Sequence, residues 1–387
     1  MTKVKIGLIG LGNMGSSHVS QLANGLVKGG QLTAVCDFNE DRLKAVNEKN
    51  GGQLACFTNP DTFFNEADIE AVLIAAPHYD HPTLAEQAFR KGFHVLIEKP
   101  AGVYTKNVQS MNEAAAESGK VFSIMYNQRT NPLYQKLRQL IQSGELGEIK
   151  RTNWIITDWY RSQSYYDSSE WRATWEGEGG GVLLNQSPHQ LDLWQWTTGL
   201  MPKRVHAFCH FGRYHNIEVE DDVTAYVEYE NGATGVFITS TGEAPGTNRF
   251  EIIGDRGKIV VENDQLIFYR LNQSEREFNA TYTGGFGEPE HWKIEIPTKG
   301  ENTQHLGIMQ NWVDAILKGT PLLAPGEEGI KGLEISNAIY LSAWLKESVE
   351  LPIDSDLFYK TLQEKIKASN FVKAKSGNAV LSVEGTH

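Results

Sequence analysis

Short apolar runs alternate with amphipathic stretches over the first third of the chain. Strands are predicted at residues 4–9, 31–36, 71–75, 94–97 and 121–126, and helices at 16–26, 83–91 and 108–118. Strands this short and this uniformly apolar are typical of a parallel sheet that helices cover on both faces. The pattern therefore predicts an α/β fold whose N-terminal domain, residues 1–127, is a doubly wound sheet of the Rossmann type.

The strand–helix alternation stops after Asn131. A helix is predicted over 132–143, and helices return over 303–350. Between them, stretches rich in β-branched and aromatic residues predict strands at 150–160, 204–211, 222–229, 234–240, 249–253 and 258–262. The segments 230–232 and 254–257 have the residues of hairpin turns. We therefore expect residues 128–387 to form an α+β domain with a large, mainly antiparallel open sheet; beyond about residue 353 the pattern does not place the last element.

Length and composition limit the classes of protein. A chain of 387 residues suggests two domains, and 22% charged with 40% hydrophobic residues is typical of a soluble globular protein. The net charge of −12 and the lack of a basic stripe argue against a nucleic-acid partner. Neither a signal peptide nor an apolar stretch of membrane-spanning length is recognisable. Cys36, Cys56 and Cys209 lack CxxC spacing, which favours reduced thiols and a cytoplasmic location.

The first strand runs into the glycine motif GLGNMG. Gly10 permits a tight turn, Gly12 lets a pyrophosphate approach the backbone, and Gly15 lets helix and strand pack closely. The following helix, which opens with Asn13 and Met14, offers free N–H groups to a diphosphate. We therefore predict that Gly10, Gly12, Asn13, Met14 and Gly15 bind a dinucleotide.

Asp37 follows the second strand, 22 residues after Gly15. A carboxylate at this point accepts hydrogen bonds from the ribose hydroxyls of NAD and repels the 2′-phosphate of NADP. Arg42 lies close by in sequence and keeps NADP open as the less favoured cofactor. The prediction is an NAD-binding domain.

Polar side chains gather at the carboxyl ends of the remaining strands, the edge at which such sheets bind ligands. The predicted cofactor residues there are Ala76, Pro77, His78, His81, Glu98, Lys99 and Asn127, and the predicted substrate residues are Lys99, Tyr126 and Arg129. For the two histidines, ordinary loop positions are an equal alternative. Lys99 stands out because the proline after it holds the backbone extended, so that the lysine points toward the cofactor crevice.

The segment 179–196, GGGVLLNQSPHQLDLWQW, carries Asn185, His189 and Asp192 at spacings of four and three. On one helix these side chains would share a face, and a histidine near a carboxylate is a candidate acid–base pair. If Ser187 instead caps a helix that begins at Pro188, Asn185 falls in the preceding turn. Asp192 either orients His189 or caps a neighbouring element. The alternative to chemistry is a buried helix whose histidine belongs to the core.

The segment 159–181 is dense in aromatic residues and arginines. The predicted substrate residues in it are Tyr160, Arg161, Trp171, Arg172 and Trp175. Aromatic faces stack on the C–H faces of a sugar ring while arginines bind its hydroxyls. An oligomer interface or a loop core is the alternative explanation. No metal site is expected, because the histidines lack ligand spacing.

The GLGNMG turn, the APHYDHP loop, the tripeptide EKP and the GGG…NQSPHQLD segment occur in an order that resembles the glucose-fructose oxidoreductase/inositol dehydrogenase/rhizopine catabolism (Gfo/Idh/MocA) family of NAD(P)-dependent oxidoreductases. The resemblance covers residues 4–352. It implies an α+β substrate domain whose sheet often forms an oligomer interface, hence a homo-oligomer, dimer or tetramer. It also implies catalytic roles for Lys99 and His189. The family often has an aspartate where this chain has Asn185, so Asn185 is assigned to substrate binding.

Oxidation of a secondary alcohol needs a hydride acceptor, a base and a positive group near the developing alkoxide. The nicotinamide, His189 and Lys99 meet these needs, so we predict an NAD-dependent dehydrogenase of a sugar, a sugar derivative or a cyclitol. One alternative is an enzyme that keeps NAD bound and cleaves glycosides by transient oxidation. Another is a non-catalytic regulator that binds dinucleotide or sugar.

Overall fold

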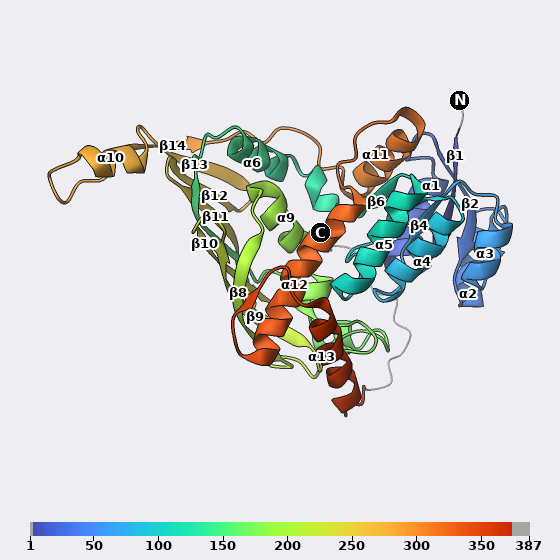
Figure 1. The fold of residues 1–387 in the computed structure, drawn as a ribbon. Coiled ribbons are helices and arrows are strands. Elements are labelled where there is room, and N and C mark those ends of the chain that lie inside the picture. Colours follow the sequence, from blue (N-terminus) through green and yellow to red (C-terminus); the bar gives the residue numbers. More distant parts are fainter. Residues whose placement is uncertain (1–2, 374–387) are drawn as a thin grey trace.

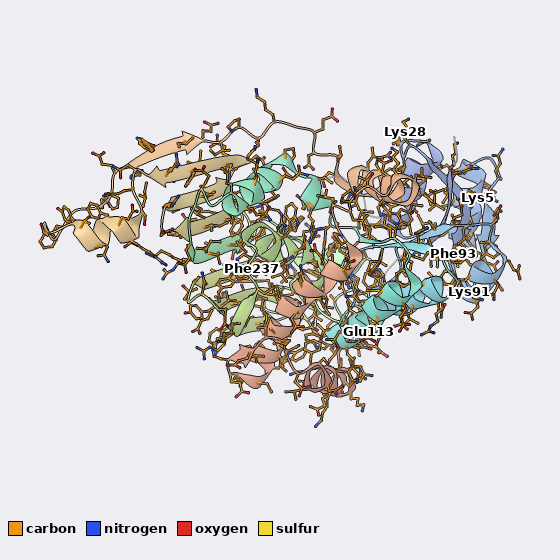
Figure 2. All side chains as sticks on the ribbon, turned by 45° about the horizontal axis from the view of Figure 1, so that its top comes forward. Lys5, Lys28, Lys91, Phe93, Glu113 and Phe237 are labelled. Carbon is orange, nitrogen blue, oxygen red and sulfur yellow. The ribbon has the colours of Figure 1, made fainter. Side chains whose placement is uncertain are left out.

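The computed structural model describes residues 3–373, which form two sheets with helices packed against each (Figure 1). The N-terminal part lies at one end of the molecule and the large C-terminal sheet at the other. Figure 2 shows Lys5, Lys28 and Lys91 projecting from the N-terminal part, whereas Phe237 lies within the C-terminal one. The predicted boundary after residue 127 falls at the short helix η1 (Asn127–Thr130), between the two sheets.

The N-terminal sheet is parallel throughout and has the strand order β3-β2-β1-β4-β5-β6. Its strands are β1 (Val4–Ile9), β2 (Gly30–Cys36), β3 (Ala55–Phe57), β4 (Ala71–Ile74), β5 (His94–Ile97) and β6 (Phe122–Ile124). The order reverses between β1 and β4, which opens a crevice at the carboxyl ends of these strands. The predicted Rossmann-type sheet is confirmed. β3 was not predicted, because it has only three residues and two of them are exposed.

Helices cover both faces of this sheet. They are α1 (Asn13–Ala23), α2 (Glu40–Lys49), α3 (Pro60–Glu66), α4 (Asp80–Arg90) and α5 (Thr105–Ser118). The side chains of Asn39 and Asn59 cap α2 and α3 by accepting backbone N–H groups. Helix α1 has no such side-chain cap, since Gly12 precedes it. The N-terminal N–H groups of α1 are therefore left for a ligand.

The C-terminal sheet has nine strands in the order β14-β13-β12-β11-β7-β10-β9-β8-β15. They are β7 (Ile149–Ile156), β8 (Pro202–Phe211), β9 (Glu220–Tyr229), β10 (Thr234–Ser240), β11 (Asn248–Gly254), β12 (Gly257–Glu262), β13 (Gln265–Leu271), β14 (His291–Glu295) and β15 (Val349–Glu350). β7 and β10 pair in parallel, and the other neighbours are antiparallel. The predicted mainly antiparallel sheet is confirmed, with β13, β14 and β15 in addition.

One face of this sheet is covered by helices. The helical elements of this part are α6 (Pro132–Gln142), α7 (Gln163–Tyr166), α8 (Val182–Asn185), α9 (Pro188–Thr198), α10 (Glu275–Thr281), α11 (Gln304–Lys318), η2 (Gly326–Glu328), α12 (Gly329–Leu345) and α13 (Ser355–Ala368). Trp154 of β7 stacks on Phe250 at 4.2 Å between centroids, and Trp194 of α9 stacks on Phe237 at 5.4 Å. These rings form the core that seats α9 on the sheet.

Helix α11 returns to the N-terminal domain late in the chain. Gln310 accepts a hydrogen bond from the backbone N–H of Lys28 and donates one to its carbonyl oxygen. A methyl group on Gly29 would lie 2.8 Å from Leu317, which shows how closely the two segments approach. The C-terminal region therefore contributes to both halves of the molecule. No helix within residues 3–373 is long and apolar enough to cross a membrane.

Arg129 of η1 lies at the junction of the domains with its side chain fully buried. Its guanidinium donates two hydrogen bonds to Asp192 of α9, at 2.8 and 2.6 Å. It also donates to Glu328 of η2 at 2.5 Å and to the carbonyl of Leu323 at 3.1 Å. Burial raises the pKa of Asp192, and the charge of Arg129 opposes that rise. These contacts connect η1, α9 and η2 and hold α9 in place beside the N-terminal domain.

The substitution Asp192→Asn leaves the guanidinium of Arg129 without its bidentate partner in a buried site. We expect the free energy of unfolding to fall by about 3–5 kcal/mol, because the buried guanidinium then keeps only the partly exposed Glu328 as a charged partner among the described residues, and removing one partner of a buried ion pair is costly. Urea denaturation followed by circular dichroism measures this. Asp314→Asn, which removes an exposed ion pair with Lys318, is the matched control and should change stability by less than about 0.5 kcal/mol. Equal losses in the two variants would contradict the prediction.

Candidate active site

The glycine loop lies between β1 and α1 at the edge of the crevice. Gly10 has φ = +92°, and a Cβ there would lie 2.4 Å from the carbonyl oxygen of Ala75. A Cβ on Gly15 would lie 1.8 Å from the carbonyl oxygen of Gly10. A Cβ on Gly12 would meet nothing among the described atoms within 4 Å. The loop therefore has the shape that a diphosphate needs, with free space over Gly12 and the uncapped N–H groups of α1 beneath.

Asp37 ends β2 beside this loop and is 6% exposed. Its Oδ2 accepts the backbone N–H of Leu11 at 2.6 Å, and its Oδ1 accepts that of Asn39 at 2.9 Å. A guanidinium nitrogen of Arg42 lies 3.8 Å from the carboxylate. The carboxylate is held rigidly where the ribose of a dinucleotide would lie, and each oxygen keeps capacity to accept a hydroxyl.

Glu98 at the end of β5 is buried against histidines. Its Oε1 lies 2.6 Å from Nε2 of His18 of α1, and its Oε2 accepts the backbone N–H of Lys99 at 3.1 Å. Burial alone would raise the pKa of Glu98, but the contacts with His18 and the charges of His305 and Lys99 hold it at about 2. The His305 ring, from α11, lies 5.6 Å from that of His18. Sequence reasoning missed both histidines, because they lie 80 residues before and more than 200 after Glu98.

Lys99 joins the two domains. Its Nζ donates a hydrogen bond of 2.7 Å to the backbone carbonyl of Asn185, the last residue of α8. Desolvation lowers the pKa of Lys99, the negative charges of Glu98 and Glu178 raise it, and Arg172 and Arg161 lower it. The structure thus brings Lys99 of the EKP tripeptide against the NQSPHQLD segment that contains His189. The roles predicted for Lys99 and His189 require these two segments to lie together.

His189 lies in the first turn of α9, where Ser187 is the N-cap residue and Pro188 the first helical residue. It is 5% exposed, and its Nδ1 has no hydrogen-bond partner among residues 3–373. Desolvation and the charges of Lys99 and His305 hold its pKa well below the usual 6.5. The ring is therefore neutral at physiological pH and free to accept a proton. Asn185 belongs to the preceding helix α8, the alternative that the capping pattern left open.

A polar cluster from the segment before α8 surrounds Asn185. Its Oδ1 accepts the hydroxyl of Tyr165 at 3.2 Å, and its Nδ2 donates to Glu178. Arg172 donates to the Tyr165 oxygen at 2.6 Å and lies over its ring at 4.4 Å. Neither Tyr165 nor Glu178 was among the predicted site residues. No sequence signal distinguished Glu178 from the two neighbouring glutamates of its loop.

Two predicted cofactor residues occupy different surroundings. Nε2 of His81 lies 2.8 Å from the carbonyl oxygen of Ala76, and Nδ1 lies 2.7 Å from that of Pro100. A neutral imidazole donates to only one of these two carbonyls, and the ring lies between the loop after β4 and the loop after Lys99. Nδ1 of His78 lies 3.2 Å from the carbonyl oxygen of Glu178, and its ring meets Trp171 edge-on. His78 therefore faces the second domain.

Three predicted substrate residues do not agree with their burial. Arg129 has no exposed surface and is engaged by Asp192 and Glu328. Tyr126 is 2% exposed, and Trp175, at 5%, packs edge-on against Tyr340 and Trp344. These side chains are core and junction residues, because the second domain closes over them. Asp192 likewise neither orients His189 nor caps a helix; its partner is Arg129.

Two further predicted residues, Asn127 and Tyr160, differ in burial. Asn127 is buried; its Nδ2 donates to Gln304, and its Oδ1 has no partner among the described residues. Tyr160 is 53% exposed, and its carbonyl accepts a hydrogen bond from Arg161. Within residues 3–373 no three His, Cys, Asp or Glu side chains gather as metal ligands.

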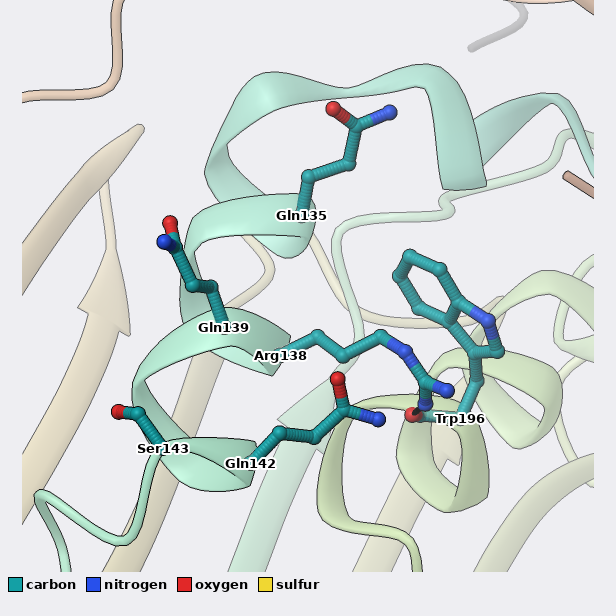
Figure 3. A pocket seen from close by; sticks show the side chains of 6 residues that line it. All are labelled: Gln135, Arg138, Gln139, Gln142, Ser143 and Trp196. Atoms are coloured by element: carbon teal, nitrogen blue, oxygen red, sulfur yellow. Dashed lines mark hydrogen bonds between the residues drawn. The ribbon is translucent and has the colours of Figure 1, made fainter.

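A surface pocket of about 390 Å³ lies elsewhere, between α6 and the end of α9 (Figure 3). Its lining residues are Gln135, Arg138, Gln139, Gln142, Ser143 and Trp196. Arg138 lies over the Trp196 ring at 4.7 Å. The lining contains amides and one guanidinium but no carboxylate or imidazole, so this pocket has no acid–base pair and is separate from the crevice.

Comparison with known proteins agrees with this geometry. Residues 4–126 match the family model described as an oxidoreductase family with an NAD-binding Rossmann fold, and residues 134–260 match the GFO/IDH/MocA C-terminal domain. The chain is 24% identical over 352 residues to the myo-inositol 2-dehydrogenase of Thermotoga maritima, with 90% of this chain and 98% of that enzyme covered.

Two further relatives are similar over nearly their whole length. The levoglucosan dehydrogenase of Pseudarthrobacter phenanthrenivorans is 24% identical over 394 residues, with 91% of this chain and 99% of that enzyme covered. The crystal structure of the WlbA dehydrogenase from Bordetella pertussis in complex with NADH and UDP-GlcNAcA superposes with a TM-score of 0.77 at 25% identity, covering 91% of this chain and 100% of that chain.

The depressed pKa of Glu98 predicts a pH-dependent contribution to stability. A carboxyl whose pKa falls from 4.5 to about 2 on folding stabilises the protein above pH 4.5 and loses this effect as pH falls toward 2. We expect the difference in free energy of unfolding between wild type and Glu98→Gln to shrink as pH falls from 6 to 3, as measured by denaturant titrations. The exposed control Glu117→Gln should show a flat difference near zero. A constant Glu98→Gln difference would contradict the assignment.

Proposed function

The chain belongs to the GFO/IDH/MocA family of NAD-binding oxidoreductases, and we propose that it oxidises a secondary hydroxyl of a sugar, a sugar derivative or a cyclitol. The observation that carries the proposal is the hydrogen bond of Lys99 to the backbone of Asn185 across the domain junction, four residues before the buried His189, whose pKa the charge of Lys99 helps to lower. The named relatives that cover the chain are dehydrogenases of an inositol and an anhydrosugar. We propose that the substrate of this chain belongs to the same broad class as the substrates of these relatives.

The residues of the N-terminal crevice fit a dinucleotide. We assign the diphosphate to Gly12 and the N–H groups opened by Asn13 and Met14, and the ribose hydroxyls to Asp37. The buried, unpartnered Oδ1 of Asn127 is an acceptor suited to an amide such as that of nicotinamide. The negative charge of Asp37 favours NAD over NADP. When bound, the nicotinamide supplies the hydride acceptor.

The proposed roles of the protein's own side chains follow from their charge states. His189 is neutral because burial and the neighbouring Lys99 oppose its protonation, so it can accept the hydroxyl proton on its imidazole. Lys99 stabilises the alkoxide oxygen that develops as this proton leaves. The backbone carbonyl of Asn185 holds Nζ of Lys99 at 2.7 Å and thereby aims it. Trp171, Arg161, Arg172 and Asn185 are proposed to bind the other hydroxyls and the faces of the ring.

The other two functions open to the sequence are less well supported. Glycoside cleavage with retained NAD and non-catalytic regulation both leave NAD without net reduction. The named relatives are dehydrogenases, and a neutral buried imidazole near a lysine suits removal of a hydroxyl proton, which a non-catalytic regulator does not need. A cytoplasmic location is likewise a proposal; the three unpaired cysteines support it.

A panel of sugars, inositols and anhydrosugars tests the function by NADH absorbance. We expect a subset to reduce NAD, and Lys99→Ala and His189→Ala each to lower kcat by roughly a hundredfold to ten-thousandfold. Because the pKa of His189 lies below 6.5, the acid limb of the kcat/KM profile should lie below pH 6.5 and vanish in His189→Ala. The exposed Lys106→Ala serves as the matched control. Full activity in either site variant would refute the roles.

We further propose that a second copy of the chain covers the outer face of the C-terminal sheet. Paired strands carry Phe208, Tyr226, Val236 and Ile238 on this face. Phe208 is 62% and Tyr226 43% exposed, and Val236 and Ile238 are only half-buried. Helices α6 and α9 occupy the opposite face, where Trp154 and Phe237 lie. Apolar side chains on a sheet face that residues 3–373 leave uncovered are typical of an oligomer contact.

Sedimentation velocity tests the interface. The wild type is expected to be a dimer or tetramer, and the double substitution Phe208→Glu/Tyr226→Glu should yield monomers, because it places charges in an apolar contact. Lys91→Glu on the N-terminal domain is the control and should leave the mass unchanged. A monomeric wild type, or an oligomer that survives the double substitution, would refute this interface.

A further inference from the structure

Glu178 is a buried carboxylate in the loop that leads into α8, and it is 1% exposed. Its Oε2 accepts the backbone N–H of Ala173 at 2.5 Å, and its Oε1 accepts the side-chain amide of Asn185. A guanidinium nitrogen of Arg172 lies 3.7 Å from Oε1. Such a carboxylate loses hydration and is retained only where hydrogen bonds and cations compensate it.

The carboxylate decides the orientation of Asn185. Because Nδ2 of the amide donates to Glu178, Oδ1 faces the hydroxyl of Tyr165 at 3.2 Å and Nε2 of Gln186 at 3.2 Å. The reverse orientation would set the amide oxygen against the carboxylate and the amide N–H₂ against two donors. The same residue, Asn185, accepts the hydrogen bond from Nζ of Lys99 through its backbone carbonyl. Glu178 is therefore linked to Lys99 through Asn185, whose side chain binds Glu178 and whose backbone carbonyl binds Lys99.

The charges around Glu178 are mainly positive. Arg172, Lys373 and Lys99 all interact with it electrostatically. On the other side of Lys99, Glu98 is already engaged by His18. Asn185 is an amide and contributes no charge. Glu178 is thus the carboxylate that balances Lys99 from the side of the second domain.

We propose that Glu178 is a positioning residue of the active site, which orients the Asn185 amide oxygen toward Tyr165, holds the residue that accepts the hydrogen bond of Lys99, and balances the charges of Lys99 and Arg172. This inference rests on the proposed function. Proton transfer to His189 adds a positive charge beside Lys99, and the carboxylate offsets that added charge.

The substitution Glu178→Gln keeps the shape and removes the charge. We expect kcat/KM for the sugar to fall roughly tenfold to a hundredfold, as for loss of a charged hydrogen bond, while NAD affinity stays unchanged. Because Glu178 raises the pKa of Lys99, its loss should also move the basic limb of the kcat/KM profile to lower pH. The other charged or titratable groups that face Lys99 are Glu98, His78, His189, His305, Arg161 and Arg172. Glu176→Gln, an exposed glutamate two residues away, is the matched control and should change neither quantity.

Exchanging the two partners provides a second test. In Glu178→Gln/Asn185→Asp the amide and the carboxylate swap places and keep one N–H···O contact and one negative charge. We expect the double variant to regain at least half of the loss in log(kcat/KM) that Glu178→Gln shows. Asn185→Asp alone should be impaired, because two adjacent carboxylates compete for one proton. A double variant no better than Glu178→Gln, or an unmoved basic limb, would overturn the proposal.

A measurement without turnover separates this inference from the proposed function. Titration of the protein carrying [ε-¹³C]lysine, with the Lys99 resonance assigned from Lys99→Ala, reports the pKa of Lys99 directly by NMR. Glu178→Gln should lower that pKa and the exchanged pair should restore it, even if no sugar of the panel is oxidised. An unchanged pKa in Glu178→Gln would refute the inference, whereas wild-type inactivity on every sugar would refute only the proposed function.

Discussion

The buried contact between Arg129 and Asp192 is the constraint on which the rest of the site depends. Arg129 stands two residues after Asn127 at the end of the first domain, and Asp192 lies one turn after His189 on α9. Two hydrogen bonds join them with both side chains at most 1% exposed. The two N–H groups that the guanidinium donates are fixed in one plane, so they fit the carboxylate in one orientation. This contact therefore sets both the position and the rotation of α9. His189 consequently reaches the crevice from the opposite domain.

Burial then decides the charge states within the crevice. His78, His189 and His305 all have lowered pKa values because desolvation penalises the imidazolium and Lys99 adds a like charge. Glu98 stays ionised because His18 and its cationic neighbours outweigh desolvation. The crevice therefore combines neutral imidazoles with one lysine that two carboxylates support. That combination suits removal of a hydroxyl proton and stabilisation of the resulting oxygen anion.

The wall contributed by the second domain is a hydrogen-bonded loop rather than a row of stacked rings. Tyr165 receives a hydrogen bond from Arg172 and donates one to Asn185, and Glu178 holds the other end of that amide. Trp175 instead supports the loop from below by packing on Tyr340 and Trp344. The aromatic residues of segment 159–181 thus have two roles. Trp175 anchors the loop, and Tyr165 belongs to the polar cluster around Asn185.

The sequence by itself determined the Rossmann-type domain, the mainly antiparallel sheet, the glycine loop and the pairing of Lys99 with His189 as candidates. Each rests on local patterns: a period of two or of 3.6, turn residues, or a motif a few residues long. Tertiary structure alone decided the roles of Arg129, Trp175 and Asp192, and it recruited His18, His305 and Glu178. Their partners lie far away in the chain, as with the 63 residues between Arg129 and Asp192. A polar side chain can bind substrate or pair with a buried opposite charge. Which of the two it does depends on the distant segments that pack against it, and the spacing of nearby residues does not reveal them.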